Sequence, residues 1–492
     1  MENYIAVMLP IILPILLGLF VLINPVYKHN RRFLIGTIIA SGVLIVAVTV
    51  SALDLENAEY TLFYLTRALP IDFKIDVLGR FFTVIVTTCW IAETVFSFRY
   101  LPENETERRF HGFNLIVLGI LYALGFSGNL MTFYMFYELM TILSMPLVIH
   151  TMDHEAVMAG LKYLFFSFAG AYCALFGFYF VQHDLNIAFT EGGSASVALL
   201  GDKAPFMLAV AFIMILGFGV KAGLFPMHGW LPTAHPVAPA PASAFLSGII
   251  VKMGVLGTIR TVYYIFGADF LRGTWVQYTW MGLALFTVFM GSMLAYREKI
   301  LKKRLAYSTV SQLSYILFGL AAMDANAAEG ALLHVLAHAF IKSTLFLCAG
   351  AMIHATGKIR VEDFKGIGKK MPITLWCFTI ASLGLIGIPP TAGFISKWYL
   401  CVGALRSPLG SLSYLGPVVL LVSAALTAGY LLPITIHGFL PGRDAVVDTE
   451  PVHEHKTMVG PMIALMVLML FAGLFPGYIM QFIDAAVSGF GL

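Results

Sequence analysis

The chain contains little charge and little cysteine for its length. Only 12% of its 492 residues are charged and 59% are hydrophobic, whereas soluble domains carry about 25% charged residues. Its apolar segments are too long and too uniform for the strands of an outer-membrane barrel, in which polar and apolar residues alternate over about ten residues. The composition therefore excludes a soluble protein and predicts an all-α polytopic membrane protein.

The cysteines show no pattern typical of a redox cluster or a disulfide framework. No CxxC spacing exists, and all five lie in or at the edge of apolar segments: Cys89, Cys173, Cys348, Cys377 and Cys401. Iron–sulfur ligation and a disulfide framework are therefore not expected. We expect no cofactor and no metal in this chain, and the sequence shows no catalytic centre that would make the chain an enzyme by itself.

Runs of roughly 20 apolar residues predict about fourteen membrane-spanning helices. Their approximate ranges are 4–23, 33–53, 76–98, 112–127, 129–150, 156–182, 204–226, 241–266, 275–296, 306–323, 329–354, 373–400, 414–440 and 457–482. Lys and Arg gather in alternate loops, most densely in 297–304 and 358–370. The positive-inside rule therefore predicts that both termini lie outside.

In two of the predicted spans a lysine accompanies a break at proline. The seventh contains Pro226 shortly after Lys221, and the twelfth contains Pro389 and Pro390 before Lys397. Broken helices at corresponding positions of two halves are typical of inverted-repeat transporters, although proline is also commoner in membrane helices generally. The pattern predicts two inverted five-helix repeats, each broken at its fourth helix. The predicted regions are three N-terminal helices in 1–110, the repeats in 111–270 and 271–440, and the last helix in 441–492.

Several ionisable side chains fall within predicted spans, and six of them are candidates for moving charge: Glu138 and the lysines Lys162, Lys221, Lys252, Lys342 and Lys397. Glu93 in the third span is expected to pair with Arg99 near the inner surface and is assigned no role. Even on the mildest scale a lysine at the centre of a membrane helix costs about 2.5–3.5 kcal/mol. His334 and His338 precede Lys342 at helical spacing and share its face. So many costly groups in one chain indicate that the chain moves charge across the membrane.

Glu138 and Lys221 are the candidate coupling pair. An amine taken out of water gives up its proton more readily, and a nearby carboxylate favours the protonated form. A change in the distance between the two groups would therefore pass a proton on. A static salt bridge that holds two helices together is the alternative interpretation.

The other ionisable groups also have plainer interpretations. Lys162 lies nearest the end of its span, where a lysine side chain can reach the membrane surface. His334 and His338 are either relay groups or hydrogen-bonded interior histidines. Haem ligation is a third interpretation, but a bis-histidine haem usually takes its ligands from two facing helices.

Three segments carry a resemblance to a known family. They are 302–320, 334–357 and 219–257, the last of which reads GVKAGLFPMHGWLPTAHPVAPAPASAFLSGIIVKMGVLG. The chain resembles, over roughly 110–400, the antiporter-like membrane subunits of respiratory complex I, of Mrp cation/proton antiporters and of energy-converting membrane-bound hydrogenases. The resemblance implies fourteen helices, two inverted repeats and a midplane row of polar residues. It also implies other membrane subunits as partners and a prokaryotic inner membrane as the location.

The resemblance also implies roles for individual residues. By position, Glu138 matches the glutamate of the family's fifth helix, Lys221 the lysine of the seventh and Lys252 that of the eighth. Lys397 matches the terminal lysine of the twelfth helix, and Lys162 matches a sixth-helix lysine found in several members. The long lateral helix of the largest members has no counterpart in the sequence.

The function expected from these observations is proton translocation within a multi-subunit ion pump, driven by redox chemistry or by cation antiport. The D-type component of an Mrp Na⁺/H⁺ antiporter, without redox coupling, is the nearest alternative. A stand-alone solute transporter, a structural scaffold and a quinone- or haem-binding subunit are alternatives of other classes. The sequence leaves open the parent complex, the electron donor, the choice between H⁺ and Na⁺, and the direction and stoichiometry of transport.

Overall fold

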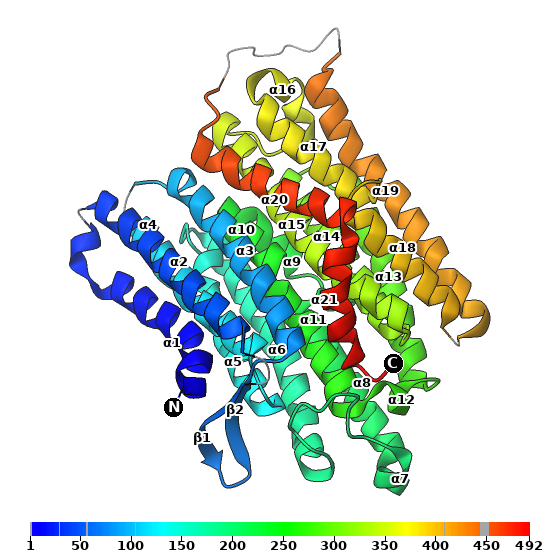
Figure 1. The fold of residues 1–492 in the computed structure, drawn as a ribbon. Coiled ribbons are helices and arrows are strands. Elements are labelled where there is room, and N and C mark those ends of the chain that lie inside the picture. The colour runs from blue at the N-terminus through cyan, green and yellow to red at the C-terminus, as the bar shows by residue number, and fades with distance from the viewer. Residues whose placement is uncertain (1, 29, 56–57, 104, 408, 443–451) are drawn as a thin grey trace.

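The computed structural model describes residues 2–28, 30–55, 58–103, 105–407, 409–442 and 452–492. It is a bundle of long helices with a two-stranded antiparallel sheet at one end (Figure 1). Within those ranges, 11 helices are long and apolar enough to cross a membrane. The prediction of a helical polytopic membrane protein is confirmed at this level.

The first half of the chain forms helices of different lengths, with the small sheet at one end of them (Figure 1). Its elements are α1 (Glu2–Ile23), α2 (Arg31–Leu53), β1 (Glu59–Thr66), β2 (Leu69–Lys74), α3 (Val77–Tyr100), α4 (Glu105–Gly125), α5 (Leu130–Val148), α6 (His154–Asp184), α7 (Val197–Leu200), α8 (Ala204–Lys221), α9 (Leu231–Val237), α10 (Ala240–Phe245), α11 (Val251–Ile259) and α12 (Ala268–Leu271). Two π-helical segments, Leu246–Ile250 and Arg260–Phe266, flank α11 and make 240–266 nearly continuous.

In the part of the second half that the structure describes, all regular elements are helices. Its helices are α13 (Trp275–Arg297), α14 (Leu301–Ala321), α15 (Ala325–Thr356), α16 (Ile367–Lys370), α17 (Pro372–Ile386), α18 (Ala392–Arg406), α19 (Leu415–Phe439), α20 (Lys456–Leu474) and α21 (Pro476–Ser488). The predicted seventh span ends early, at Lys221, and the predicted fourteenth span is divided between α20 and α21. The hairpin of β1 and β2 was not anticipated.

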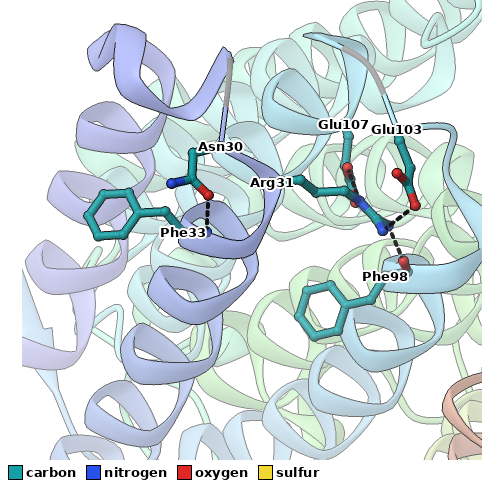
Figure 2. A network of polar contacts seen from close by, with 6 residues as sticks. All are labelled: Asn30, Arg31, Phe33, Phe98, Glu103 and Glu107. Carbon is teal, nitrogen blue, oxygen red and sulfur yellow. Dashed lines mark hydrogen bonds and ion pairs between the residues drawn. The ribbon is translucent and has the colours of Figure 1, made fainter.

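Polar side chains begin several of the long helices. Asn30 accepts a hydrogen bond from the Phe33 N–H at 3.1 Å at the start of α2 (Figure 2). Asp76, Asn129 and Asp153 cap α3, α5 and α6 in the same way. The first N–H groups of a helix have no partner within the helix, so these caps stabilise the ends where the chain enters each span.

An arginine network fastens α2 to its neighbours at the end of the bundle opposite the hairpin. Arg31 donates to Glu107 at 2.8 and 3.0 Å, to Glu103 at 2.7 Å and to the carbonyl of Phe98 (Figure 2). The fork of the guanidinium suits such multiple acceptors. The contacts join the start of α2 to the last turn of α3 and the first turn of α4, so the apolar helix α2 is held by its polar end.

Both chain ends lie at the hairpin end of the bundle (Figure 1). The Tyr4 and Tyr60 rings are 4.4 Å apart between centroids, and Gly192 N–H donates to the Gly489 carbonyl at 3.0 Å. The expectation that both termini lie outside the membrane stays a prediction.

The centre of the bundle is formed by the segment 240–266 and by α15. In the most apolar stretch of each helix, all residues of segment 240–266 and 94% of those of α15 are buried, compared with 28% of those of α2. The two central helices carry Lys252 and Lys342. The costliest charges in the chain are therefore placed away from lipid, where protein groups can solvate them.

Candidate functional site

The break after α8 is closed by side chains from neighbouring parts of the bundle. Pro226 lies in this break and has no N–H to donate. The Val220 carbonyl accepts from the indole N–H of Trp230 at 3.0 Å, and the Phe225 N–H donates to the Thr287 hydroxyl at 3.1 Å. Since lipid offers no hydrogen bonds, such contacts allow a helix to stop inside the bundle.

Lys221 is the last residue of α8, immediately before the break. Its ammonium donates to the hydroxyls of Thr141 at 2.9 Å, Tyr163 at 3.0 Å and Ser167 at 2.9 Å. These bonds use all three of its donors, and the residue is 0% exposed. The Tyr163 ring centroid lies 4.4 Å from Nζ, so cation–π attraction adds to the hydrogen bonds.

Glu138 lies one turn before Thr141 on α5 and is half-buried. Its Oε1 atom accepts from the Tyr134 hydroxyl at 3.1 Å, and its buried Oε2 atom has no hydrogen-bond partner. Among the described ion pairs, none joins it to Lys221 within 4.0 Å. The static salt bridge is thus not formed in this structure, and the coupling role of the two residues stays a prediction.

Lys252 lies in α11, shortly after a π-helical turn. The residue is 1% exposed, and its ammonium donates to the Ser247 carbonyl at 2.5 Å. Ser247 belongs to the π-helical turn Leu246–Ile250. Such turns are frequent at functional sites because they alter the backbone hydrogen bonding of a helix locally.

The two histidines on α15 have unequal surroundings. His334 lies between the Ser396 hydroxyl, 2.9 Å from Nδ1, and Gln312 Oε1, 3.1 Å from Nε2. His338 is 0% exposed, and neither of its ring nitrogens has a hydrogen-bond partner. The rings stack with centroids 6.0 Å apart. The predicted shared face is therefore present, and His334 is a hydrogen-bonded interior histidine in this structure, whereas His338 is not.

Lys342 and Lys397 are both held partly by main-chain carbonyls. The Lys342 ammonium donates to the Leu305 carbonyl at 2.9 Å and to the Ser308 hydroxyl. The Lys397 ammonium, beyond the break that contains Pro389 and Pro390, donates to the carbonyls of Leu385 at 2.6 Å and Ile386 at 2.9 Å. Lys397 therefore binds the last turn of the helix that the prolines interrupt.

Lys162 differs from the other predicted lysines because its side chain is exposed on the surface of α6. It donates to the Thr233 hydroxyl of α9 at 3.0 Å and lines a surface pocket of about 680 Å³. This position agrees with the interpretation that its ammonium reaches a surface. Its role in proton transfer stays a prediction.

One buried carboxylate was missed. Glu93 was assigned no role from its position in the chain and was expected to pair with Arg99 near the inner surface. In the structure Glu93 is 2% exposed and accepts from the Ser343 hydroxyl at 3.0 Å. The signal was available, because Glu93 lies within an apolar span as Glu138 does. Among the residues that the structure describes, no group of three or more His, Cys, Asp or Glu side chains is arranged to hold a metal ion.

A family model described as NADH:quinone oxidoreductase/Mrp antiporter, transmembrane, matches residues 127–427. NADH-quinone oxidoreductase subunit N of Desulforudis audaxviator is 35% identical over 417 residues, which cover 82% of this chain and 79% of the relative. Hydrogenase-4 component B of Escherichia coli is 31% identical over 379 residues, 72% of this chain but only 54% of that relative.

The fold is also found among solved structures. A chain in the Mrp complex from Dietzia sp. superposes with a TM-score of 0.84, covering 100% of this chain and 98% of that one at 21% identity. These matches confirm the family resemblance that the three sequence segments indicate.

Proposed function

The chain belongs to the NADH:quinone oxidoreductase/Mrp antiporter transmembrane family, and we propose that it is the proton-translocating subunit of a multi-subunit membrane ion pump. The observation that carries the proposal is the enclosure of Lys221. Its ammonium is buried at a helix break, bonded only to hydroxyls, with the incompletely bonded carboxylate of Glu138 on the same neighbouring helix as Thr141.

Hydroxyls are suited to a lysine that gains and loses its proton. Each can accept a hydrogen bond from the ammonium and, after rotation, donate one to the neutral amine. Moving one charge against about 150 mV costs roughly 3.5 kcal/mol. Such a cost lies within what the burial of an ionisable group and a nearby opposite charge supply. Glu138 approaching or leaving Lys221 would drive the exchange.

The relay proposed beyond this pair runs through the two central helices. Lys252 and His338 pass the proton laterally, and Lys342 or Lys397 delivers it to the other side. The unpartnered ring nitrogens of His338 support its part, because a relay histidine needs one free nitrogen to accept and one to release. His334, bonded on both sides, would hold the Ser396 and Gln312 side chains next to this route, and Lys162 would act at the surface of α6.

The proposed architecture is fourteen membrane helices in two inverted five-helix repeats, preceded by three helices. The breaks after α8 and α17 support it, since each is followed by a short continuation, α9 and α18. The partners proposed are the other membrane subunits of the parent complex, and the membrane proposed is a prokaryotic cell membrane with both termini outside. Redox cofactors would lie on those other subunits.

Proton transfer by the intact complex tests the function. Inside-out vesicles that carry Glu138→Gln or Lys221→Ala should lose proton uptake by about a hundredfold, because general acid–base groups contribute 10²–10⁴-fold. Glu155→Gln and Lys203→Ala, exposed residues of the same types, are the matched controls and should retain uptake. Near-normal coupling in both test variants, with the complex assembled, would remove the assigned pair.

A cation antiporter without redox coupling is the second candidate. The family model that matches residues 127–427 is described for Mrp antiporters as well as for NADH:quinone oxidoreductase, which supports it. Proton efflux driven by a Na⁺ gradient in vesicles without an electron donor would identify this function, whereas uptake that requires an electron donor would identify the redox-driven pump.

A further inference from the structure

Helix α3 carries a buried carboxylate that the proposed relay does not use. Glu93 is 2% exposed. Its Oε1 atom accepts from the Ser343 hydroxyl of α15 at 3.0 Å, while its buried Oε2 atom has no hydrogen-bond partner. An ionisable group inside a membrane protein costs several kcal/mol, and a carboxylate retained only to join two helices would be expected to use both oxygens. One oxygen of Glu93 is held and the other is free.

The central helix packs closely against this contact through Gly248. Gly248 lies in the π-helical turn Leu246–Ile250, directly beside the Ser343 hydroxyl. A methyl group at position 248 would overlap the hydroxyl oxygen and lie 3.4 Å from Glu93 Oε1. Glycine in a helix interior is less favourable than alanine. The turn therefore gives up helix stability and leaves room for the bonded carboxylate.

Two titratable groups lie near Glu93. Lys252, from α11 beyond the same π-helical turn, donates to the carbonyl of Ser247, next to Gly248, and among the described ion pairs none joins it to Glu93 within 4.0 Å. Cys89, one turn earlier on α3, is fully buried. The other helices that pack on α3 keep their charges away. The charged residues of α4 and α2 lie near the starts of these helices, in 105–111 and 31–32. α10 has no charged residue, and the single charged residues of α20 and α21, Lys456 and Asp484, are exposed. Lys342 of α15 points to α14 through its bonds to Leu305 and Ser308.

We propose that Glu93 is a second acidic proton carrier of the relay, exchanging a proton with Lys252 between α3 and the central helix. This inference rests on the proposed function. In the step, the Lys252 ammonium leaves the Ser247 carbonyl, approaches the free Oε2 of the Glu93 carboxylate and gives it one proton, which leaves a neutral amine and a neutral carboxylic acid. The reverse transfer restores both charges. The Ser343 hydroxyl holds Oε1, and no hydrogen bond occupies Oε2.

This role makes α3 part of the translocation machinery. The step removes two buried charges together, so neither Lys252 nor Glu93 is left as an unpaired ion when the proton moves on. A buried charge that loses its partner is strongly destabilising. The carboxylate therefore lowers the barrier for the lateral transfer that the proposed function assigns to Lys252.

The test compares two buried carboxylates in the intact complex. Glu93→Gln should reduce proton uptake into inside-out vesicles by about tenfold or more, and Glu93→Asp should recover part of it with a shifted pH profile, because only a proton carrier imposes its own titration on the rate. Glu107→Gln, which removes a carboxylate bonded by Arg31, is the matched control. It should change the amount of assembled complex without moving the pH profile.

Infrared difference spectroscopy keeps the test decisive if Glu93→Gln assembles poorly. A carboxylic-acid band that appears on turnover of the normal complex and is shifted in Glu93→Asp supports the proposal. Uptake above half of normal in Glu93→Gln, or an unchanged pH profile and band in Glu93→Asp, overturns it. Lys221→Ala, measured in parallel, separates the two ideas. If Lys221→Ala retains uptake the proposed function fails, whereas loss in that variant with normal Glu93→Gln removes only the role of Glu93.

Discussion

The two helix breaks hold their lysines in different ways. At the first break Lys221 is fully buried and donates only to side-chain hydroxyls, which come from α5 and α6. At the second break Lys397 is partly buried and donates only to the carbonyls of Leu385 and Ile386, in the last turn of α17. The acceptors of the two lysines therefore differ in kind.

The difference matters when a lysine loses its proton. A hydroxyl can turn and donate to the neutral amine. The two carbonyls at Lys397 belong to the end of a helix, whose partial negative charge favours the protonated form of the lysine. We infer that the first break is suited to exchanging a proton and the second to holding a fixed positive charge. Lys342, which donates to the Ser308 hydroxyl as well as to a carbonyl, is then favoured over Lys397 as the delivering residue.

Arginine at each break gives the largest expected contrast. A guanidinium is not deprotonated in proteins, so Lys221→Arg should reduce proton uptake by about a hundredfold or more. Lys397→Arg still supplies a positive charge and donors for two carbonyls. Its proton uptake should therefore stay at least about tenfold above that of Lys221→Arg. The measurement is the initial rate of uptake in inside-out vesicles, divided by the amount of assembled complex.

Equal loss in the two arginine variants would break the comparison, because both lysines would then have to release a proton. Lys397→Gln supplies the internal check, since it removes the charge but keeps one donor group. It should lose more activity than Lys397→Arg if a fixed charge is what the second break needs.

Removal of single hydroxyls around Lys221 is the next largest effect. Ser167→Ala or Thr141→Val deletes one hydrogen bond to a charged group, worth about 1.5–3 kcal/mol, which corresponds to about tenfold or more in rate. The matched control is Ser292→Ala, because Ser292 is a buried serine bonded to the hydroxyl of Ser423 and to that of Ser311. Uptake that falls as much in the control as at the first break would contradict the special role of these hydroxyls.

The sequence predicted the breaks but not the surroundings of their lysines. Apolar run length and proline are local signals, so Lys221 and the Pro389–Pro390 pair could be placed before the structure was known. The acceptors are long-range. Thr141 lies 80 residues from Lys221 in the chain, and Ser343 lies 250 residues from Glu93. Nothing in their spacing distinguishes these hydroxyls from others within apolar runs.

The backbone irregularities were also beyond a sequence prediction. The residues of the π-helical turn Leu246–Ile250 would also fit an ordinary α-helix. The turn is explained by its packing against α15 and α3, which the sequence does not reveal. Glu93 was passed over for a related reason. Its distance along the helix from Arg99 suggested a local partner, whereas the tertiary contact with Ser343 decides its surroundings.

Glycines at the breaks provide a smaller test that separates stability from function. Gly223 and Gly387 have φ angles of +74° and +92°, where a side chain costs about 1–2 kcal/mol. A methyl group at 223 would meet Leu231, whereas one at 387 would lie 2.9 Å from Lys397 Cδ. Both alanine variants should lower the thermal unfolding temperature of the complex. Only Gly387→Ala should also change uptake per assembled complex, by displacing the lysine.

The smallest expected effect concerns Glu298, in the loop between α13 and α14, a charged group outside the spans. Burial raises its pKa, but the N–H groups of Ile300 and Lys299 and the ammonium of Lys303 outweigh burial, so the pKa lies below its usual value. A depressed pKa stabilises the fold above the ordinary value of about 4.3, and the gain is lost as the pH falls through the lower folded value.

Glu298→Gln should therefore lower stability by about 1 kcal/mol or less at pH 7. The difference from the normal complex should shrink toward zero in acid, where the normal carboxylate is protonated as well. Thermal unfolding of the purified complex across this range measures it, with uptake unchanged at neutral pH. If uptake instead fell as far as in Ser167→Ala, a charged group in a loop would affect proton transfer as much as a hydroxyl bonded to Lys221. The acceptors of the two lysines would then no longer explain a difference between the breaks.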